Sequence, residues 1–277
     1  MKLLMDSLIV AWIKTKEVLF SPFNLNNWLT FGIISSFITG SLAGLPSLAS
    51  LISLFAINDT VITIVIASIL IYIKAHATFI FMESILKNKI DIMEYWKSLN
   101  EKSGSYLLWL ILISWLTFLL AMIPFLGCFA IFLIMIISFV AENAAVPAMM
   151  KMSSSINILG AVKIILNRFK TEWKKGLLFL FSLFVMDFIW NVIILIPSFL
   201  LAYFITNKFG ISTDIKLISA EIFFFFYMII PVYSIFRTNY CLSSISIILP
   251  EYKILMPVKN DNGKIIKTKT MYDGWLD

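Results

Sequence analysis

Long apolar stretches decide what this chain can fold into. A helix that crosses a bilayer needs about 20 mainly apolar residues. Six segments of the sequence meet or approach that length: 28–45, 61–82, 106–123, 128–150, 177–205 and 217–249. The chain is 60% hydrophobic and only 14% charged, whereas about a quarter of the residues in a soluble domain are charged. We therefore predict an all-α fold, a polytopic membrane protein with six transmembrane helices in three hairpins.

The same stretches divide the chain into a transmembrane domain over 1–250 and a cytoplasmic tail over 251–277. The domain consists of an amphipathic helix and three hairpins, over 1–20, 28–87, 106–150 and 177–249. In the tail, turn-forming residues at 260–263 predict a small hairpin. The apolar stretch 46–57 is too short to cross a bilayer, and we interpret it as interfacial or re-entrant.

Lysine and arginine lie mostly on one side of the predicted spans. Of the 22, 18 lie in the N-terminal segment, in the segments after the second and fourth spans, and in the tail. Only Lys208 and Lys216 lie on the other side. Basic residues favour the cytoplasmic side of a membrane. This distribution predicts a cytoplasmic (inner) membrane protein with both termini in the cytoplasm.

Four ionisable residues interrupt the predicted spans: Lys74, Glu142, Asp187 and Arg237. Charges in hydrocarbon are costly and usually face a bundle interior or a water-filled cavity. At 1.5 Å per helical residue, all four lie roughly 15–18 Å from the cytoplasmic ends of their helices. Asn191 lies one turn from Asp187 and extends this polar layer. We predict that the two acids pair with the two bases inside the bundle.

Three interpretations of the polar layer stay open. The ion pairs hold helices together, or the charges line a path for a substrate or for protons. Alternatively, the even-numbered spans extend into the cytoplasm, so that Lys74, Glu142 and Arg237 reach the interface by snorkelling. His76 does not share the helix face of Lys74, and we expect it to be a satisfied interior residue.

The segment between the fourth and fifth spans has an apolar face at helical spacing. That face consists of Ile156, Leu159, Val162, Ile165, Leu166, Phe169 and Trp173. Basic residues lie off the face or follow it, namely Lys163, Arg168, Lys170, Lys174 and Lys175. The pattern predicts an amphipathic helix on the inner leaflet whose basic residues contact lipid headgroups. The alternative is a connector that packs on the cytoplasmic end of the bundle.

Catalytic and metal-binding motifs are absent from the sequence. There is no HExxH, no GxSxG and no Gly-rich phosphate loop. One histidine and the isolated Cys128 and Cys241 offer no metal site. Because the net charge of +6 lies in segments that flank apolar spans, membrane lipids rather than nucleic acids are the expected partners. A protein partner or a homo-oligomer is not specified, and we expect no cofactor.

These features predict a non-enzymatic accessory or scaffold component of the cytoplasmic membrane, or a lipid-interacting one. The alternative is a transporter or channel for a small solute or lipid that uses the polar layer. A membrane-embedded lipid enzyme is the least favoured class.

Four segments carry a family resemblance: PFNLNNWL, FIFMESILKNKIDIMEYW, AENAAVPAMM and FRTNYCLSSISIILPEY. Over roughly 10–255 the chain resembles an uncharacterised family of bacterial and archaeal multi-pass membrane proteins. That family is distantly similar to the membrane domain of some glycerophosphoryl diester phosphodiesterases. The resemblance implies that members of the family carry a basic residue at the position of Lys74, an acid at that of Glu142 and an arginine at that of Arg237. The chain has no phosphodiesterase domain, so that activity is not expected.

Overall fold

The computed structural model describes residues 2–21, 23–39, 60–121, 123, 126–151, 157–209, 215–249, 255–259 and 265–270. The helices in chain order are α1 (Lys2–Phe20), α2 (Leu25–Thr39), α4 (Thr60–Lys87), α5 (Ile92–Ser98), α6 (Asn100–Ala121), α7 (Leu126–Val140), the π-helix η1 (Ala141–Ala145), α8 (Val146–Lys151), α9 (Ile158–Thr171), α10 (Trp173–Phe209) and α11 (Ile215–Ile248). The strands β1 (Leu255–Lys259) and β2 (Ile265–Thr270) form an antiparallel ribbon. The predicted helical architecture and the predicted tail hairpin are confirmed. The segments 46–57 and 260–263 lie outside the described residues.

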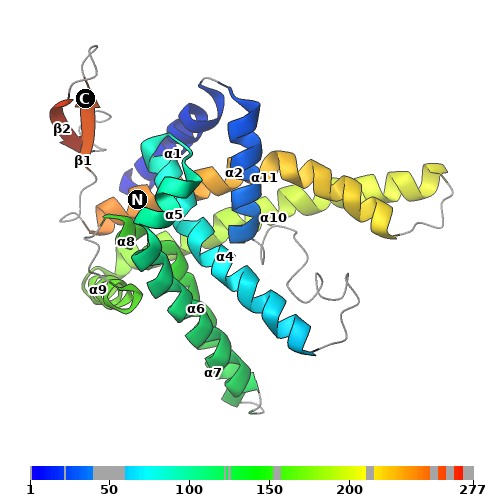
Figure 1. Cartoon of the computed structure of the whole chain (residues 1–277), viewed down its shortest axis with the longest axis horizontal. Helices are drawn as coiled ribbons and strands as arrows, with labels where there is room; N and C mark the ends of the chain where they lie inside the picture. Colours follow the sequence, from blue (N-terminus) through cyan, green and yellow to red (C-terminus); the bar gives the residue numbers. More distant parts are fainter. Residues whose placement is uncertain are drawn as a thin grey trace.

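Each predicted hairpin range contains two helices that contact one another: α2 with α4, α6 with α7, and α10 with α11. Figure 1 shows α4 and the α6–α7 hairpin running in a similar direction from a common centre, and the α10–α11 hairpin leaving it in another direction. We call this centre the hub. It comprises α1, α5, η1, α8 and α9 with the near ends of their neighbours, at 75–87, 100–109, 173–183 and 234–249. The outer parts of the described hairpins are called the arms.

The hub contains the core. Its fully buried side chains include Phe79, Phe81, Tyr95, Tyr106, Met149, Ile165, Phe179, Leu183, Ile235 and Tyr240. Every residue from Ala75 to Met82 of α4 is buried. A helix that is apolar all round must be covered on all sides. In the hub, α5, α6 and α8 contact α4, and α1 packs along α11.

The arms expose large apolar side chains. These are Val65, Ile69 and Tyr72 of α4; Leu112, Trp115, Leu116, Leu119, Phe132, Leu133, Met135 and Ile136 of α6 and α7; and Phe184, Phe188, Ile189, Val192 and Ile193 of α10. Among the described residues, Ser68–Lys87 and Phe132–Met150 are long and apolar enough to cross a membrane. Two such segments are weak evidence for a membrane protein, and six spans are not confirmed by them.

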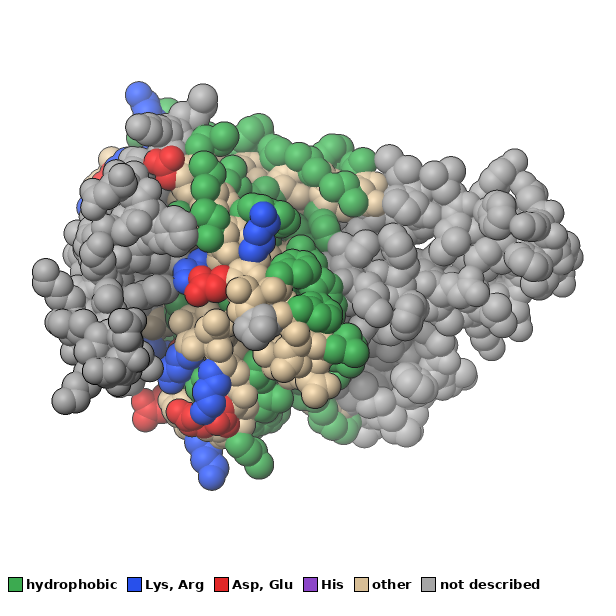
Figure 2. Space-filling view, turned by 90° about the horizontal axis from the view of Figure 1, so that it is seen from above, with side chains coloured by type: hydrophobic (Ala, Val, Ile, Leu, Met, Phe, Trp, Pro, Cys, Tyr) green, Lys and Arg blue, Asp and Glu red, His purple; other side chains and the backbone are tan. Residues whose placement is uncertain are grey.

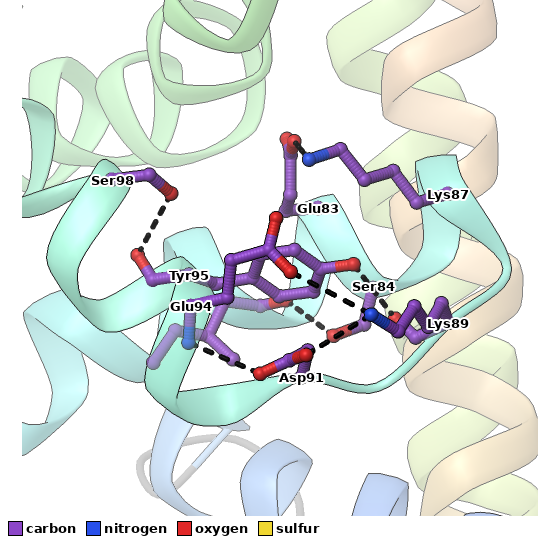
Figure 3. Close-up of polar contacts among 9 residues, drawn as sticks. Glu83, Ser84, Lys87, Lys89, Asp91, Glu94, Tyr95 and Ser98 are labelled. Atoms are coloured by element: carbon purple, nitrogen blue, oxygen red, sulfur yellow. Dashed lines mark hydrogen bonds and ion pairs between the residues drawn. The ribbon is translucent and has the colours of Figure 1, made fainter.

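Figure 3 shows the corner between α4 and α5, which is held by polar contacts. Asn88 turns the chain with a positive φ of 49°, a conformation that asparagine tolerates at the end of a helix. Lys89 then binds Asp91 at 3.0 Å and Glu94 at 3.6 Å, while Asp91 accepts from the Glu94 N–H. The Glu94 N–H and the Lys89 ammonium hold the pKa of Asp91 below its usual range. The corner is therefore an internally satisfied charge cluster that starts α5.

Two basic side chains cover the C-terminal ends of helices in the hub. The Lys102 Nζ donates to the Met149 carbonyl of α8 at 2.7 Å, and the Arg168 Nε donates to the Ile248 carbonyl of α11 at 2.9 Å. The last carbonyls of a helix lack intrahelical partners and attract positive charge. Burial lowers the pKa of Lys102. These bonds tie α6 to α8 and α9 to α11.

The structure corrects the predicted apolar face of α9. The buried residues are Ile158, Ala161, Val162 and Ile165, whereas Leu159 and Leu166 of the predicted face are 57% and 45% exposed. The helix packs against α6, η1, α8 and α10, as the connector alternative expects. Apolar residues occupy more than one stripe of α9, so packing rather than composition selects the buried one. The Ile158 N–H donates to Ser105 Oγ at 2.9 Å and fixes the start of the helix.

Gly176 lets α9 and α10 approach closely. A Cβ at this position would lie 2.7 Å from Cγ and 2.8 Å from Cδ1 of Phe169. We expect Gly176→Ala to lower the free energy of unfolding of the purified full chain in detergent by about 1–3 kcal/mol, because it overpacks this contact. Thermal unfolding measures the change, and Phe169→Leu should restore part of it.

Gly104 of α6 is the matched control, because a Cβ there meets nothing within 4 Å. Gly104→Ala should be neutral or stabilising, since alanine favours a helix over glycine. Equal stability of the two alanine variants would contradict the close contact between Gly176 and Phe169.

Candidate functional site: paired charges between hub and arms

The first ion pair joins the two longest helices. The Arg237 Nε lies 2.9 Å from Asp187 Oδ1 and its Nη2 lies 3.1 Å from Oδ2, which is a bidentate pair. The side chains are 18% and 15% exposed. The Tyr233 hydroxyl also donates to Asp187 Oδ1, and its ring stacks on Trp190 at 4.3 Å. Planar guanidinium and carboxylate groups match one another's geometry, so this contact fixes the register of α10 against α11.

The second ion pair joins α4 to η1. The Lys74 Nζ lies 3.3 Å from Glu142 Oε1, and the two side chains are 25% and 32% exposed. The contact has a single short distance, and its side chains are more exposed than those of the first pair. Both acids thus pair with the two bases, and the predicted pairing of this polar layer is confirmed.

Glu142 lies in a π-helix rather than in regular α-helix. The Val146 N–H bonds to the Ala141 carbonyl, five residues back, and Pro147 follows without an N–H of its own. A π-helical turn inserts extra backbone and redirects the side chains beside it. Here it turns Glu142 toward Lys74 and places Asn143 in the buried core, with 2% exposure.

Asn143 and Cys241 connect the two ion pairs. Cys241 lies one helical turn beyond Arg237 on α11, and its Sγ lies 3.9 Å from Oδ1 of Asn143, the residue after Glu142. The Asn143 amide donates back to the Phe139 carbonyl at 2.8 Å. The Cys241 contact therefore joins the helix that carries Arg237 to the π-helix that carries Glu142.

The four charges lie at the edge of the hub, with Glu142 and Arg237 inside it and Lys74 and Asp187 just outside it. On the hub side of Lys74, residues from Ala75 to Met82 are buried, while Tyr72 on the arm side is 40% exposed. Val140, Ala141 and Asn143 around Glu142 are buried, and exposure begins farther back on α7, at Ile137. Asp187 lies between buried Leu183 and exposed Phe188. Beyond Arg237, the residues from 239 to 246 of α11 are buried. The charges thus form one boundary layer across the described helices.

The remaining predicted residues divide into three groups. His76 is 2% exposed, contacts the Tyr72 carbonyl and Asn100, and stacks on Trp96, which confirms it as a satisfied interior residue. The Asn191 side chain lies outside the described part of the structure. Of the basic residues around α9, Lys163, Lys170 and Lys174 are exposed.

Arg168 and Lys175 hold the Glu172 carboxylate, at 3.0 and 2.5 Å. The Lys175 ammonium, with the charge of Arg168, lowers the pKa of Glu172. Together with the bond from Arg168 to the Ile248 carbonyl, these contacts give both residues a structural role at the α9–α10 corner.

Sequence reasoning missed three parts of the site. Tyr233 lies four residues before Arg237, and helical spacing alone could have placed it beside the pair. The π-helix had a signal in Pro147, which removes a backbone donor shortly after Glu142. The contact between Asn143 and Cys241 has no local signal, because it joins residues far apart in the chain.

Each carboxylate of the layer lies against a basic side chain, so opposite charges meet in both pairs. Within the described residues no three His, Cys, Asp or Glu side chains gather in a way that could hold a metal ion.

Comparisons with known proteins find a partial match to one family model and no activity. No curated protein and no solved structure matches the chain. The similarity to glycerophosphoryl diester phosphodiesterases is not shown by these comparisons. The matching family model covers α1 to α7 and the first residue of η1, including Lys74 and the α4–α5 corner. Residues 4–141, just under half of the chain, match the model of a family of unknown function, DUF7544.

Proposed function

We propose that this chain is a six-span protein of the cytoplasmic membrane that serves as a non-enzymatic scaffold or accessory component, with both termini in the cytoplasm. The exposed apolar side chains on the arms support the multi-span proposal, because all three hairpins carry them. Monomeric soluble proteins rarely expose contiguous apolar patches of this kind. Lipid is the partner that would cover them.

The single observation that carries the scaffold proposal is the complete pairing of the boundary charges. Each acid has a base within 3.3 Å, and the pairs join α10 to α11 and α4 to η1. Breaking such a pair in a water-poor environment is costly. The first pair therefore fastens the two helices of the α10–α11 hairpin to one another, and the second fastens α4 to the neighbouring α6–α7 hairpin through η1.

The position of the layer fits the inner half of a membrane. From Thr60 to Lys74 the arm of α4 measures about 21 Å at 1.5 Å per residue, whereas a hydrocarbon core is about 30 Å thick. Figure 2 shows, on one face, charged side chains gathered toward one end of the long axis and apolar side chains farther along it.

The second candidate is a transporter for a small solute or lipid. It is favoured by the Lys74–Glu142 pair, which is partly exposed and whose acid lies in a π-helix. π-helical turns are frequent at functional sites. In this proposal the pair opens to water from both sides of the membrane in turn.

Cysteine accessibility separates the two proposals. In a Cys128→Ser/Cys241→Ala background, Ser234→Cys places a thiol on α11 three residues before Arg237, where the serine is 4% exposed. We expect a membrane-impermeant maleimide to label it from neither side, because the layer is dry in the scaffold proposal. The control Ser21→Cys, at the exposed end of α1, should react only from the cytoplasmic side of sealed vesicles. Labelling of Ser234→Cys from both sides would reject the scaffold and support transport.

A further inference from the structure

One surface of α9 and the start of α10 alternates between apolar and basic side chains. Its members follow one another at intervals of three or four residues, with Trp173 and Lys174 adjacent: Leu159, Lys163, Leu166, Lys170, Trp173, Lys174 and Leu177. We call them the α9 strip. Its apolar members are 45–60% exposed, and its three lysines are also exposed. Within α9, intervals of three and four residues place Leu159, Lys163, Leu166 and Lys170 on one helix face, and Trp173, Lys174 and Leu177 follow in the first turns of α10.

The core of the hub does not use the α9 strip. The opposite side of α9 already packs on the hub through Ile158, Ala161, Val162 and Ile165. Phe169 packs toward α10, against Gly176 and Phe179. Other residues of α9 thus pack in the core. The strip is a second surface of the connector, and it is exposed.

The strip is positively charged without an acid among its members. The nearest acid in sequence, Glu172, is held by Arg168 and Lys175, which are not members. The Lys174 ammonium lies 5.8 Å from the centre of the Trp173 ring. Lysines beside exposed leucines and a tryptophan are complementary to a surface whose outer layer carries phosphate and whose next layer is apolar.

The orientation of α9 agrees with this complementarity. Figure 1 shows α9 nearly along its axis, while α4, α6 and α10 are seen from the side. A helix that runs across the directions of the hairpins lies parallel to a membrane that they cross. The strip continues onto the first turn of α10, where such a helix would enter the bilayer.

We propose that the α9 strip binds the headgroups of anionic phospholipids in the cytoplasmic leaflet. Leu159, Leu166 and Leu177 enter the acyl boundary, and Lys163, Lys170 and Lys174 contact headgroup phosphates. This inference rests on the proposed membrane location of the chain. It separates the basic residues by role, because Arg168 and Lys175 serve the fold and the three strip lysines face the lipid.

The test uses the full chain in liposomes with two fluorophore positions. In the Cys128→Ser/Cys241→Ala background, one fluorophore is attached at Asn167→Cys, an exposed residue beside the strip, and another at Leu112→Cys on the α6 arm. Liposomes contain either brominated phosphatidylglycerol or brominated phosphatidylcholine at the same mole fraction. We expect the fluorophore at 167 to be quenched more strongly by the anionic lipid, and the fluorophore at 112 to be quenched by both.

Lys163→Gln/Lys170→Gln should lower the relative association constant for the anionic lipid at position 167 by roughly ten- to thirtyfold at low salt. The charge-matched control is Lys16→Gln/Lys97→Gln, which removes two exposed lysines from α1 and α5 and should retain the preference. Equal quenching by the two lipids at 167, an equal loss in the control, or no loss in the strip variant would overturn the proposal. Absence of quenching at 167 with normal quenching at 112 would overturn it too, while absence at both positions would instead reject the membrane location.

Discussion

Replacing Arg237 with leucine is expected to lower the free energy of unfolding of the full chain by about 3–5 kcal/mol, the usual cost of leaving one member of a buried ion pair without its partner. Asp187 would keep its Tyr233 contact but lose both guanidinium bonds. Unfolding of the purified protein in detergent, followed by circular dichroism, measures the change.

The double variant Asp187→Leu/Arg237→Leu should recover most of this loss. Replacing a whole buried ion pair with apolar residues is often neutral or stabilising, because no charge is then left unpaired. Tyr233→Phe serves as the control, since it removes one hydroxyl and keeps the ring on Trp190; its expected cost is about 1 kcal/mol. A double variant whose loss of stability equals the sum of the losses in Asp187→Leu and Arg237→Leu would mean that the two side chains contribute independently and do not form the pair.

The sequence reveals the boundary layer because the cost of a charge in an apolar helix is a local property. Lys74, Glu142, Asp187 and Arg237 stand out for that reason alone. Which acid meets which base is a different matter, because it depends on which helices become neighbours. Helical spacing predicts that Asn191 shares a face with Asp187, but only the packing of α10 on α11 brings Arg237 and Tyr233 to the same carboxylate.

The limits of pattern analysis are clearest at α9 and η1. A period of 3.6 residues identifies α9 as amphipathic, yet Leu159 and Ile158 are adjacent apolar candidates for the buried face, and the bond from Ile158 to Ser105 helps decide between them. In η1, counting residues at α-helical spacing misplaces the neighbours of Glu142, because one turn is π-helical. Long-range contacts decide both cases.

Basic residues on the predicted cytoplasmic side have several uses in this fold. Lys102 and Arg168 cover the ends of α8 and α11, Lys89 closes the α4–α5 corner, and the strip lysines are exposed. A count of positive charge predicts orientation but cannot distinguish these uses. The distinction matters for mutagenesis, because neutralising Arg168 should loosen the hub, whereas neutralising Lys163 should leave the hub intact.

The second large effect is expected at the other ion pair. Glu142→Lys would place two ammonium groups where the structure has an ion pair of 3.3 Å, and juxtaposed like charges cost several kcal/mol. We expect the variant to unfold at a clearly lower temperature in detergent. The control is Glu101→Lys, the same substitution at an exposed acid, which should cost no more than about 1 kcal/mol, because Glu101 meets only the dipole of the first turn of α6.

Exchanging the charges tests the geometry of η1 directly. Lys74→Glu/Glu142→Lys should recover much of the stability lost in Glu142→Lys, because the attraction is restored with its direction reversed. Recovery requires that position 142 faces α4, which in the structure depends on the π-helical turn before Pro147. A swapped variant no more stable than Glu142→Lys would show that the two positions do not face one another. The Lys74–Glu142 pair is more exposed than the pair at Arg237, so the exchanged side chains have room to adjust. Failure of the rescue would therefore count heavily against this pair as a link between α4 and the α6–α7 hairpin.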